Sequence, residues 1–183
     1  LIDTNAIFWW SPTATLSDST SLNPIASPLV STEYFFNLLN PGCNIINNAD
    51  FESGNVGFTS QYIYTPLNVA GGEYFVGPNS LAWNPWLGSF SDHTTGSGNM
   101  LLVNGSPVPN TSVWCKTLTV TPNTDYVFSA WIQNINIWGV ASNPAILQFS
   151  VNGNLLGNAF TTTVNAGIWQ QFYQTWNSGA NTT

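Results

Sequence analysis

Residues 145–155 have the sequence AILQFSVNGNL, in which side chains alternate up to an Asn-Gly pair. A period of two places successive side chains on opposite faces of a β-strand. The Asn152-Gly153 pair is the strongest short signal for a tight turn between antiparallel strands, because both residues adopt the left-handed conformation easily. The stretch therefore predicts a β-hairpin whose return strand begins near Leu155. One face of its first strand carries Ala145, Leu147, Phe149 and Val151, and the other carries Ile146, Gln148 and Ser150.

Other parts of the chain show the same alternation. Residues 113–120 lead into the tetrapeptide Thr-Pro-Asn-Thr at 121–124, and residues 126–133 alternate again after it. Proline sets φ for a turn and asparagine tolerates the left-handed position, so a second hairpin is predicted here. A further strand is expected over 168–176. Helical periodicity is nearly absent and turn residues recur about every eight to twelve positions, which predicts an all-β antiparallel sandwich.

Charge is scarce in this chain and almost entirely negative. Only 5% of its 183 residues are charged, against about 25% in ordinary globular proteins. Lys116 is the single basic residue apart from one histidine, and eight acidic residues give a formal net charge of -7. Nucleic acid binding depends on clustered Lys and Arg, so the composition argues against such a partner. Binding to an anionic membrane surface is disfavoured for the same reason.

Aromatic residues supply the apolar area for a core. The chain has nine Trp, eleven Phe and six Tyr, and each buried ring removes roughly 150–250 Å² from water. Disordered chains lack this aromatic content. No run approaches about 18 consecutive apolar residues, so no membrane-spanning helix is predicted. The chain begins at Leu1 without a recognisable signal peptide and is interpreted as a mature or excised piece.

The two cysteines, Cys43 and Cys115, are too few for a disulfide scaffold. They either form one bond in an oxidising compartment or remain small buried apolar residues. The sequence leaves both alternatives open.

Two short polar motifs interrupt the apolar pattern: DFESG at 50–54 and DHTTGSGNM at 92–100. Together they resemble the opening strand and the mid-domain loop of extracellular jelly-roll modules, namely MAM-type adhesion domains and the related carbohydrate-binding modules. This resemblance implies a galactose-binding-like jelly-roll sandwich that recognises a ligand at a cell surface and does not turn over substrate.

The first part of the chain has a different character, rich in Pro and Ser. Its segments are FWWSP at 8–12, LSD at 16–18, NPIASP at 23–28 and TEYFF at 32–36. They resemble the last part of an Ig-like or PKD-like repeat in the giant surface adhesins of gliding and other bacteria that export through a type IX secretion system. The resemblance implies a secreted, cell-surface protein. About 40 residues with two expected strands are too few to bury a core alone.

Two modules are therefore predicted, an Ig/PKD-like remnant over 1–41 and a jelly roll over 42–183. The boundary is marked by Asn40-Pro41-Gly42. Jelly rolls of the resembled kind close with a strand that carries an acidic pair, and the chain ends at Thr183 without one. A neighbouring β-domain or another chain is expected to complete the sheet, because a bare edge favours aggregation.

Asp50 and Glu52 are expected on one side of an opening strand, since they alternate with Phe51. In the resembled modules this region contributes to a structural Ca²⁺ site, and carboxylate oxygens suit that ion. The alternative is a solvated or capping carboxylate.

Asp92 and His93 form a pair in which a carboxylate could orient an imidazole. No motif places a nucleophile beside them, and the chain has one histidine. The favoured interpretation is structural: Asp92 and Thr94 hydrogen-bond the loop backbone, while Gly96 and Gly98 permit a tight turn.

Trp83 and Trp86 lie in a loop that contains Pro and Gly, and Trp138 lies in the later Ile-Trp-Gly segment at 137–139. Exposed indoles beside amides are suited to holding sugars, because the ring stacks on CH groups and the amides bind hydroxyls. These three residues are the candidate glycan site. In the alternative interpretation the rings cap the sandwich or pack against residues 1–41.

The sequence and the resemblance together predict a non-catalytic extracellular adhesin module that attaches to a glycan or another surface ligand. One alternative is a filament subunit completed by strand addition from a neighbour. Another is an accessory carbohydrate-binding module of a polysaccharide hydrolase. No cofactor other than structural Ca²⁺ is expected.

Overall fold

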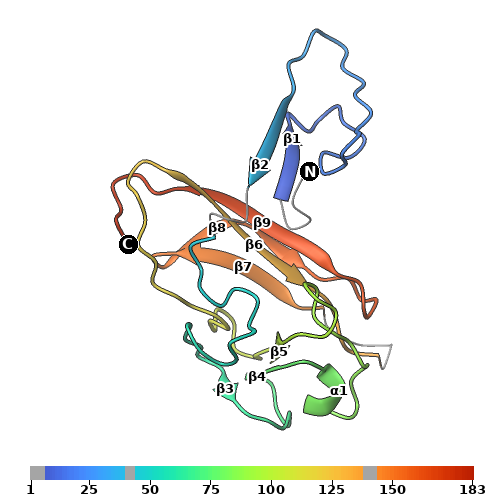
Figure 1. The fold of residues 1–183 in the computed structure, drawn as a ribbon, viewed down its shortest axis with the longest axis vertical. Coiled ribbons are helices and arrows are strands. Elements are labelled where there is room, and N and C mark those ends of the chain that lie inside the picture. Colours follow the sequence, from blue (N-terminus) through green and yellow to red (C-terminus); the bar gives the residue numbers. More distant parts are fainter. Residues whose placement is uncertain (1–6, 40–43, 138–143) are drawn as a thin grey trace. The chain divides into compact units, whose positions relative to one another are not determined.

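A computed structural model describes residues 7–39, 44–137 and 144–183. The chain divides into two compact units, Leu1–Ile45 and Ile46–Thr183. The sequence placed the boundary after residue 41. Strands in antiparallel and mixed pairings dominate the described residues and helix is almost absent, so the prediction of an all-β protein is confirmed (Figure 1).

The first unit is built on one antiparallel pair, β1 (Ile7–Ser11) with β2 (Phe35–Leu39). The ring of Phe36 contacts both Phe8 and Trp10, at centroid distances of 5.6 and 5.0 Å. The indole N–H of Trp10 donates to the carbonyl of Ser21 (3.1 Å). The FWWSP motif therefore anchors the long connection between the two strands.

In the second unit, the hairpin predicted from AILQFSVNGNL is confirmed. Strand β7 (Ile146–Val151) pairs antiparallel with β8 (Asn154–Thr161). Asn152 and Gly153 have φ values of 51° and 78°. Both lie in the left-handed region that this two-residue turn requires and that Asn and Gly tolerate best.

The other predicted hairpin is wrong. Strand β6 (Asp125–Ile132) pairs with β9 (Gln170–Asn177) and not with residues 113–120. The turn at 121–124 does form, with Asn123 at a φ of 53°. Residues 113–120 bond to other segments. Cys115 forms an isolated antiparallel β-bridge with Thr59, and the Val120 N–H donates to the Thr182 carbonyl (2.9 Å).

The physical reason for this pairing is the aromatic face that β9 offers. Phe172 lies opposite Ala130 in the register and Trp176 opposite Tyr126. Phe172 is buried, whereas its neighbour Tyr173 is exposed. The inner face of β9, which the sequence left unassigned, therefore carries Phe172 and Trp176.

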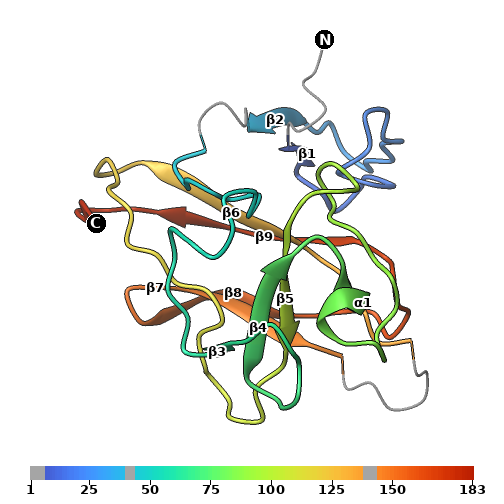
Figure 2. The same ribbon diagram turned by 60° about the horizontal axis from the view of Figure 1, so that its bottom comes forward.

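The β6–β9 and β7–β8 pairs lie as two layers, one over the other (Figures 1 and 2). Phenylalanine rings hold the layers together. Phe149 of β7 and Phe172 of β9 stack with centroids 4.3 Å apart and planes at 3°. Phe160 of β8 also stacks on Phe172 (5.1 Å), and Phe128 of β6 contacts Phe149 (6.1 Å).

A second cluster of buried residues lies beside a three-stranded sheet. The sheet has the order β3 (Ile63–Tyr64), β4 (Glu73–Gly77), β5 (Met100–Asn104), with β3–β4 parallel and β4–β5 antiparallel. The short helix α1 (Ser80–Trp83) follows β4. Trp83 packs with Met100 and Leu102 at the centre of this cluster. No helix of the described ranges has the length and hydropathy needed to cross a membrane.

Candidate functional site

The DFESG motif forms a turn, so the prediction of an opening strand there is wrong. Phe51 has a φ of 64°, a left-handed value that an extended strand does not adopt. Asp50 Oδ1 accepts a hydrogen bond from the Glu52 backbone N–H (3.2 Å). Asp50 and Glu52 therefore do not share one face of a strand.

The Asn48 side chain explains why the chain turns here. Its Oδ1 accepts from the Ser53 N–H (2.8 Å), and its Nδ2 donates to the carbonyls of Gly54 (2.9 Å) and Val56 (2.8 Å). Asparagine side chains that bind nearby backbone groups in this way compete with a strand ladder. The local sequence thus favours a braced turn over alternation.

Glu52 connects the two polar motifs. Its Oε1 accepts from the Asn99 backbone N–H (2.9 Å), 47 residues further along the chain. Asn99 Nδ2 returns a hydrogen bond to the Glu52 carbonyl (3.4 Å). A Cβ atom on Gly98 would collide with Glu52 Oε1, so a larger residue here would displace the Glu52 side chain from its present position.

Asp92 braces the loop that leads to Asn99. Only 6% of Asp92 is exposed. Its carboxylate accepts from the backbone N–H groups of Thr95 (2.6 Å) and Gly98 (2.7 Å) and from the Thr95 hydroxyl (3.1 Å). Burial raises the pKa of Asp92, but these hydrogen bonds, with another from the Thr94 backbone, outweigh burial and leave the pKa below its ordinary value of 3.8.

His93 packs against two indoles and contacts no nucleophile that the structure describes. Its ring stacks on Trp131 with centroids 4.0 Å apart and meets Trp169 edge-on at 5.4 Å. Burial lowers the pKa of His93 from its ordinary value of 6.5, against the opposing charge of Asp92. The imidazole is therefore a packing group at neutral pH.

The hydrogen bonds of Asp92 support its structural interpretation. The threonine hydroxyl that accepts from the loop backbone belongs to Thr95, at 3.2 Å from the Ser97 N–H and 2.8 Å from the Gly98 N–H, and not to Thr94 as predicted.

Gly98→Ala is expected to lower the free energy of unfolding by about 0.5–1.5 kcal/mol, because the new methyl displaces Glu52 and removes its exposed hydrogen bond to the Asn99 N–H. Urea unfolding of both proteins measures the difference. Gly105→Ala is the matched control, since nothing lies within 4 Å of a Cβ there. Equal stability of the two variants would contradict a stabilising role for the hydrogen bond between Glu52 and Asn99.

The described residues contain no group of three or more His, Cys, Asp or Glu side chains that could hold a metal ion. One oxygen of Glu52 already accepts from Asn99, and Asp50 turns back on its own loop. Calcium binding at Asp50 and Glu52 remains a prediction. Cys115 is exposed, and Cys43 lies outside the described residues, as does any bond between them.

The three predicted glycan-binding tryptophans do not form one site among the described residues. Trp83 is 1% exposed, and its indole N–H donates to the Thr65 carbonyl (2.9 Å). Trp83 is therefore a core residue with no face for a ligand, which corrects the prediction. Trp86, three residues away, is 68% exposed. Trp138 lies outside the described residues.

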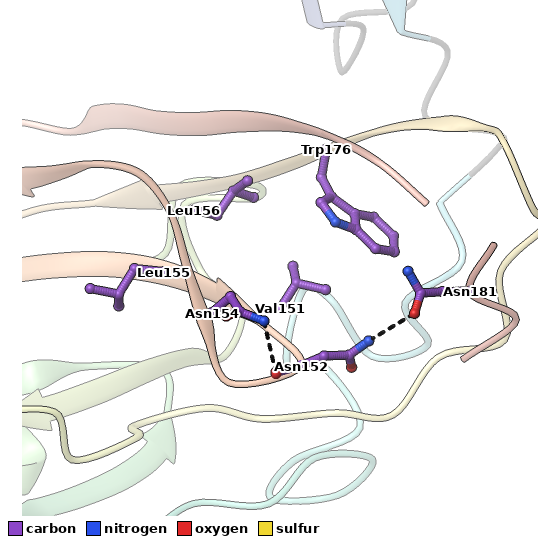
Figure 3. Close-up of a pocket in the computed structure, with 7 residues that line it drawn as sticks. All are labelled: Val151, Asn152, Asn154, Leu155, Leu156, Trp176 and Asn181. Atoms are coloured by element: carbon purple, nitrogen blue, oxygen red, sulfur yellow. Dashed lines mark hydrogen bonds between the residues drawn. The ribbon is translucent and has the colours of Figure 1, made fainter. Parts of the chain in front are cut away.

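A different tryptophan lines a pocket beside the β7–β8 turn (Figure 3). The pocket has a volume of about 190 Å³. The Trp176 indole extends from β9 into the space between the hairpin and the carboxyl-terminal segment. Apolar and amide side chains complete the wall: Val151, Asn152, Asn154, Leu155, Leu156 and Asn181.

Neighbouring groups hold this wall in place. The rings of Tyr126 and Phe128 contact Trp176 at centroid distances of 5.9 and 6.1 Å. Asn181 Nδ2 donates to the Ser178 carbonyl (2.6 Å) and Asn152 Nδ2 to Asn181 Oδ1 (3.4 Å). These contacts fix an indole and several amides around one hollow of mixed polarity, an arrangement suited to small polar molecules with CH-rich faces.

The sequence does not predict this pocket, although it predicts two of the elements that form it. The Asn152-Gly153 turn and the strand that ends near Trp176 were both predicted. The missing information was their proximity, which follows from β6–β9 pairing and the stacking of the two layers. Three amides at 152, 154 and 181 look ordinary in a chain this rich in asparagine.

Comparison with models of known protein families, with curated proteins and with solved structures found no match.

Proposed function

We propose that the chain is a non-catalytic, extracellular attachment module that binds a glycan in the pocket at Trp176. The observation that carries the proposal is the composition of the pocket wall: one indole, three asparagine amides and the aliphatic side chains of Val151, Leu155 and Leu156. Sugars present CH groups to aromatic rings and hydroxyls to amides, so this wall matches both halves of their surface.

The architecture and composition support an extracellular setting. A jelly roll preceded by an Ig-like unit is the arrangement that the sequence resemblance implies, and the two aromatic-packed layers fit a sandwich of that kind. Amides and hydroxyls replace charges on the surface, since 5% of residues are charged. The same pocket would serve a surface adhesin or a module attached to a polysaccharide hydrolase.

Asn154→Ala is expected to weaken glycan binding about tenfold, since it removes one hydrogen-bonding group worth about 1.4 kcal/mol at the ligand. Asn181→Ala is expected to weaken binding less, because both polar atoms of Asn181 already bond Ser178 and Asn152. Binding of the full chain to a printed glycan panel, followed by titration with the best glycan, measures this.

Asn165→Ala is the matched control, because Asn165 is exposed and follows the opposite end of β8. Its affinity is expected to equal that of the unaltered chain. If the control loses as much affinity as the pocket variants, or if the unaltered chain binds no glycan, the proposed function is wrong.

A second candidate function is a filament subunit completed by strand addition. Within the described ranges, the β6–β9 and β7–β8 pairs are each two-stranded sheets with unpaired edges. A groove of about 220 Å³ lies between residues 158–160 of β8 and 171–174 of β9. Open strand edges pair readily with an added strand. Analytical ultracentrifugation over a wide concentration range tests it: a growing multimer supports the filament, and a monomer throughout opposes it.

A further inference from the structure

We infer that the pocket at Trp176 takes a single uncharged sugar ring at the end of a glycan and excludes acidic sugars. This inference rests on the proposed function and names the ligand class of the same site. Its basis is the charge, the size and the free polar groups of the pocket.

The charge of the pocket excludes acidic ligands. Its wall contains no Lys, Arg or His and no carboxylate. The sole lysine of the chain, Lys116, donates to the Asn47 carbonyl (3.2 Å) and is not part of this wall. The formal net charge is -7. A sugar carboxylate or sulfate would lose its hydration here without gaining a cation. The free-energy cost of this desolvation is much smaller for an uncharged hydroxyl.

The size of the pocket favours one ring. Its volume of about 190 Å³ lies below the roughly 300–1,000 Å³ typical of sites that enclose drug-sized ligands. One indole lines it, so one ring has an aromatic surface to stack on. A polysaccharide lying along the surface would need further rings in a row. The pocket therefore suits a terminal residue.

The unused hydrogen-bonding groups also match hydroxyls. Within the described part of the chain, no hydrogen bond engages Asn152 Oδ1, Asn154 Oδ1 or the Trp176 indole N–H, whereas the amide nitrogens of Asn152 and Asn154 bind Asn181 Oδ1 and the Asn152 carbonyl. Two acceptors and one donor thus remain for a ligand. Hydroxyl groups donate and accept equally well and satisfy both kinds.

The test uses the full chain and a panel of neutral oligosaccharides ending in glucose, galactose, mannose or N-acetylglucosamine. Each is paired with a counterpart whose terminal residue carries a sulfate or a sialic acid. We expect the best neutral glycan to bind at least about tenfold more tightly than its acidic counterpart. The free monosaccharide that corresponds to the terminal residue should compete with the neutral glycan for the pocket. Affinity should change less than twofold between about 50 and 500 mM NaCl, because no ion pair is screened.

Asn181→Lys supplies the reciprocal variant. The new cation in the wall is expected to raise affinity for the acidic counterpart severalfold, an effect that salt removes. Asn165→Lys adds the same charge away from the pocket and should leave the ratio unchanged. Preference of the unaltered chain for acidic glycans, or failure of every monosaccharide to compete, would overturn the ligand class while leaving glycan binding intact. Binding to no glycan at all would overturn the proposed function together with this inference.

Discussion

Replacing Trp83 by alanine is expected to lower the free energy of unfolding by about 3–5 kcal/mol, the range for large aromatic residues removed from a core. Trp83 is 1% exposed and packs with Met100 and Leu102, while Phe75, Leu87, Ile135 and Trp169 surround that cluster. The change leaves a cavity and also leaves the Thr65 carbonyl without its donor. Urea unfolding followed by far-ultraviolet circular dichroism measures it without relying on tryptophan fluorescence.

Trp86→Ala provides the control, because the same atoms are removed from a side chain that is 68% exposed. Its effect should stay near 0.5 kcal/mol, about the usual size for surface substitutions. Trp83→Phe separates packing from hydrogen bonding, since it keeps an aromatic ring and loses the N–H. Similar losses at positions 83 and 86 would show that the burial of Trp83 has been misassigned.

Asp92→Ala is expected to cost on the order of 3 kcal/mol, because two backbone N–H groups lose a charged acceptor in a nearly buried site. Thr95 and Gly98 supply those groups, at 2.6 and 2.7 Å. Asp92→Asn keeps the shape of the side chain and removes its charge, so a smaller loss is expected. Thermal unfolding at neutral pH ranks the three proteins.

The contribution of Asp92 depends on pH in a definite direction. Its pKa in the folded protein lies below the ordinary value of 3.8, so the carboxylate stabilises the fold above that pH. The contribution is lost as pH falls through the lowered pKa. The stability difference between the unaltered chain and Asp92→Asn should therefore shrink as the solution is made more acidic than about pH 3.8. A difference that stays constant or grows would contradict the hydrogen-bonded loop.

Local signals explain which parts of the fold the sequence predicts. The β7–β8 hairpin is correct because its turn residues and both strands are adjacent in the chain. The turn at 121–124 also forms, yet its expected partner, residues 113–120, does not pair with β6. The strand that does pair with β6 is β9, which begins at Gln170. Aromatic packing between segments far apart in the sequence decides this pairing, so no turn sequence between adjacent strands predicts it.

The candidate site shows the same limit. Trp83 and Trp86 have equivalent sequence surroundings, and only the packing of α1 against β5 makes one buried and the other exposed. Asp50 and Glu52 were expected in a strand, and the Asn48 side chain instead holds a turn. The pocket combines residues from β7, β8, β9 and the carboxyl-terminal segment. Sequence alone identifies such residue types without showing which of them meet.

The position at which a neutral glycan contacts the protein decides between the pocket at Trp176 and any other site. Chemical-shift mapping of the ¹⁵N-labelled full chain during titration with the best neutral glycan locates that contact. The predicted result is a saturable shift of the Trp176 indole N–H and of the side-chain amides of Asn152, Asn154 and Asn181, with the Trp86 indole signal unmoved. Shifts centred on Trp86, or saturable binding that leaves the Trp176 indole signal in place, would contradict it.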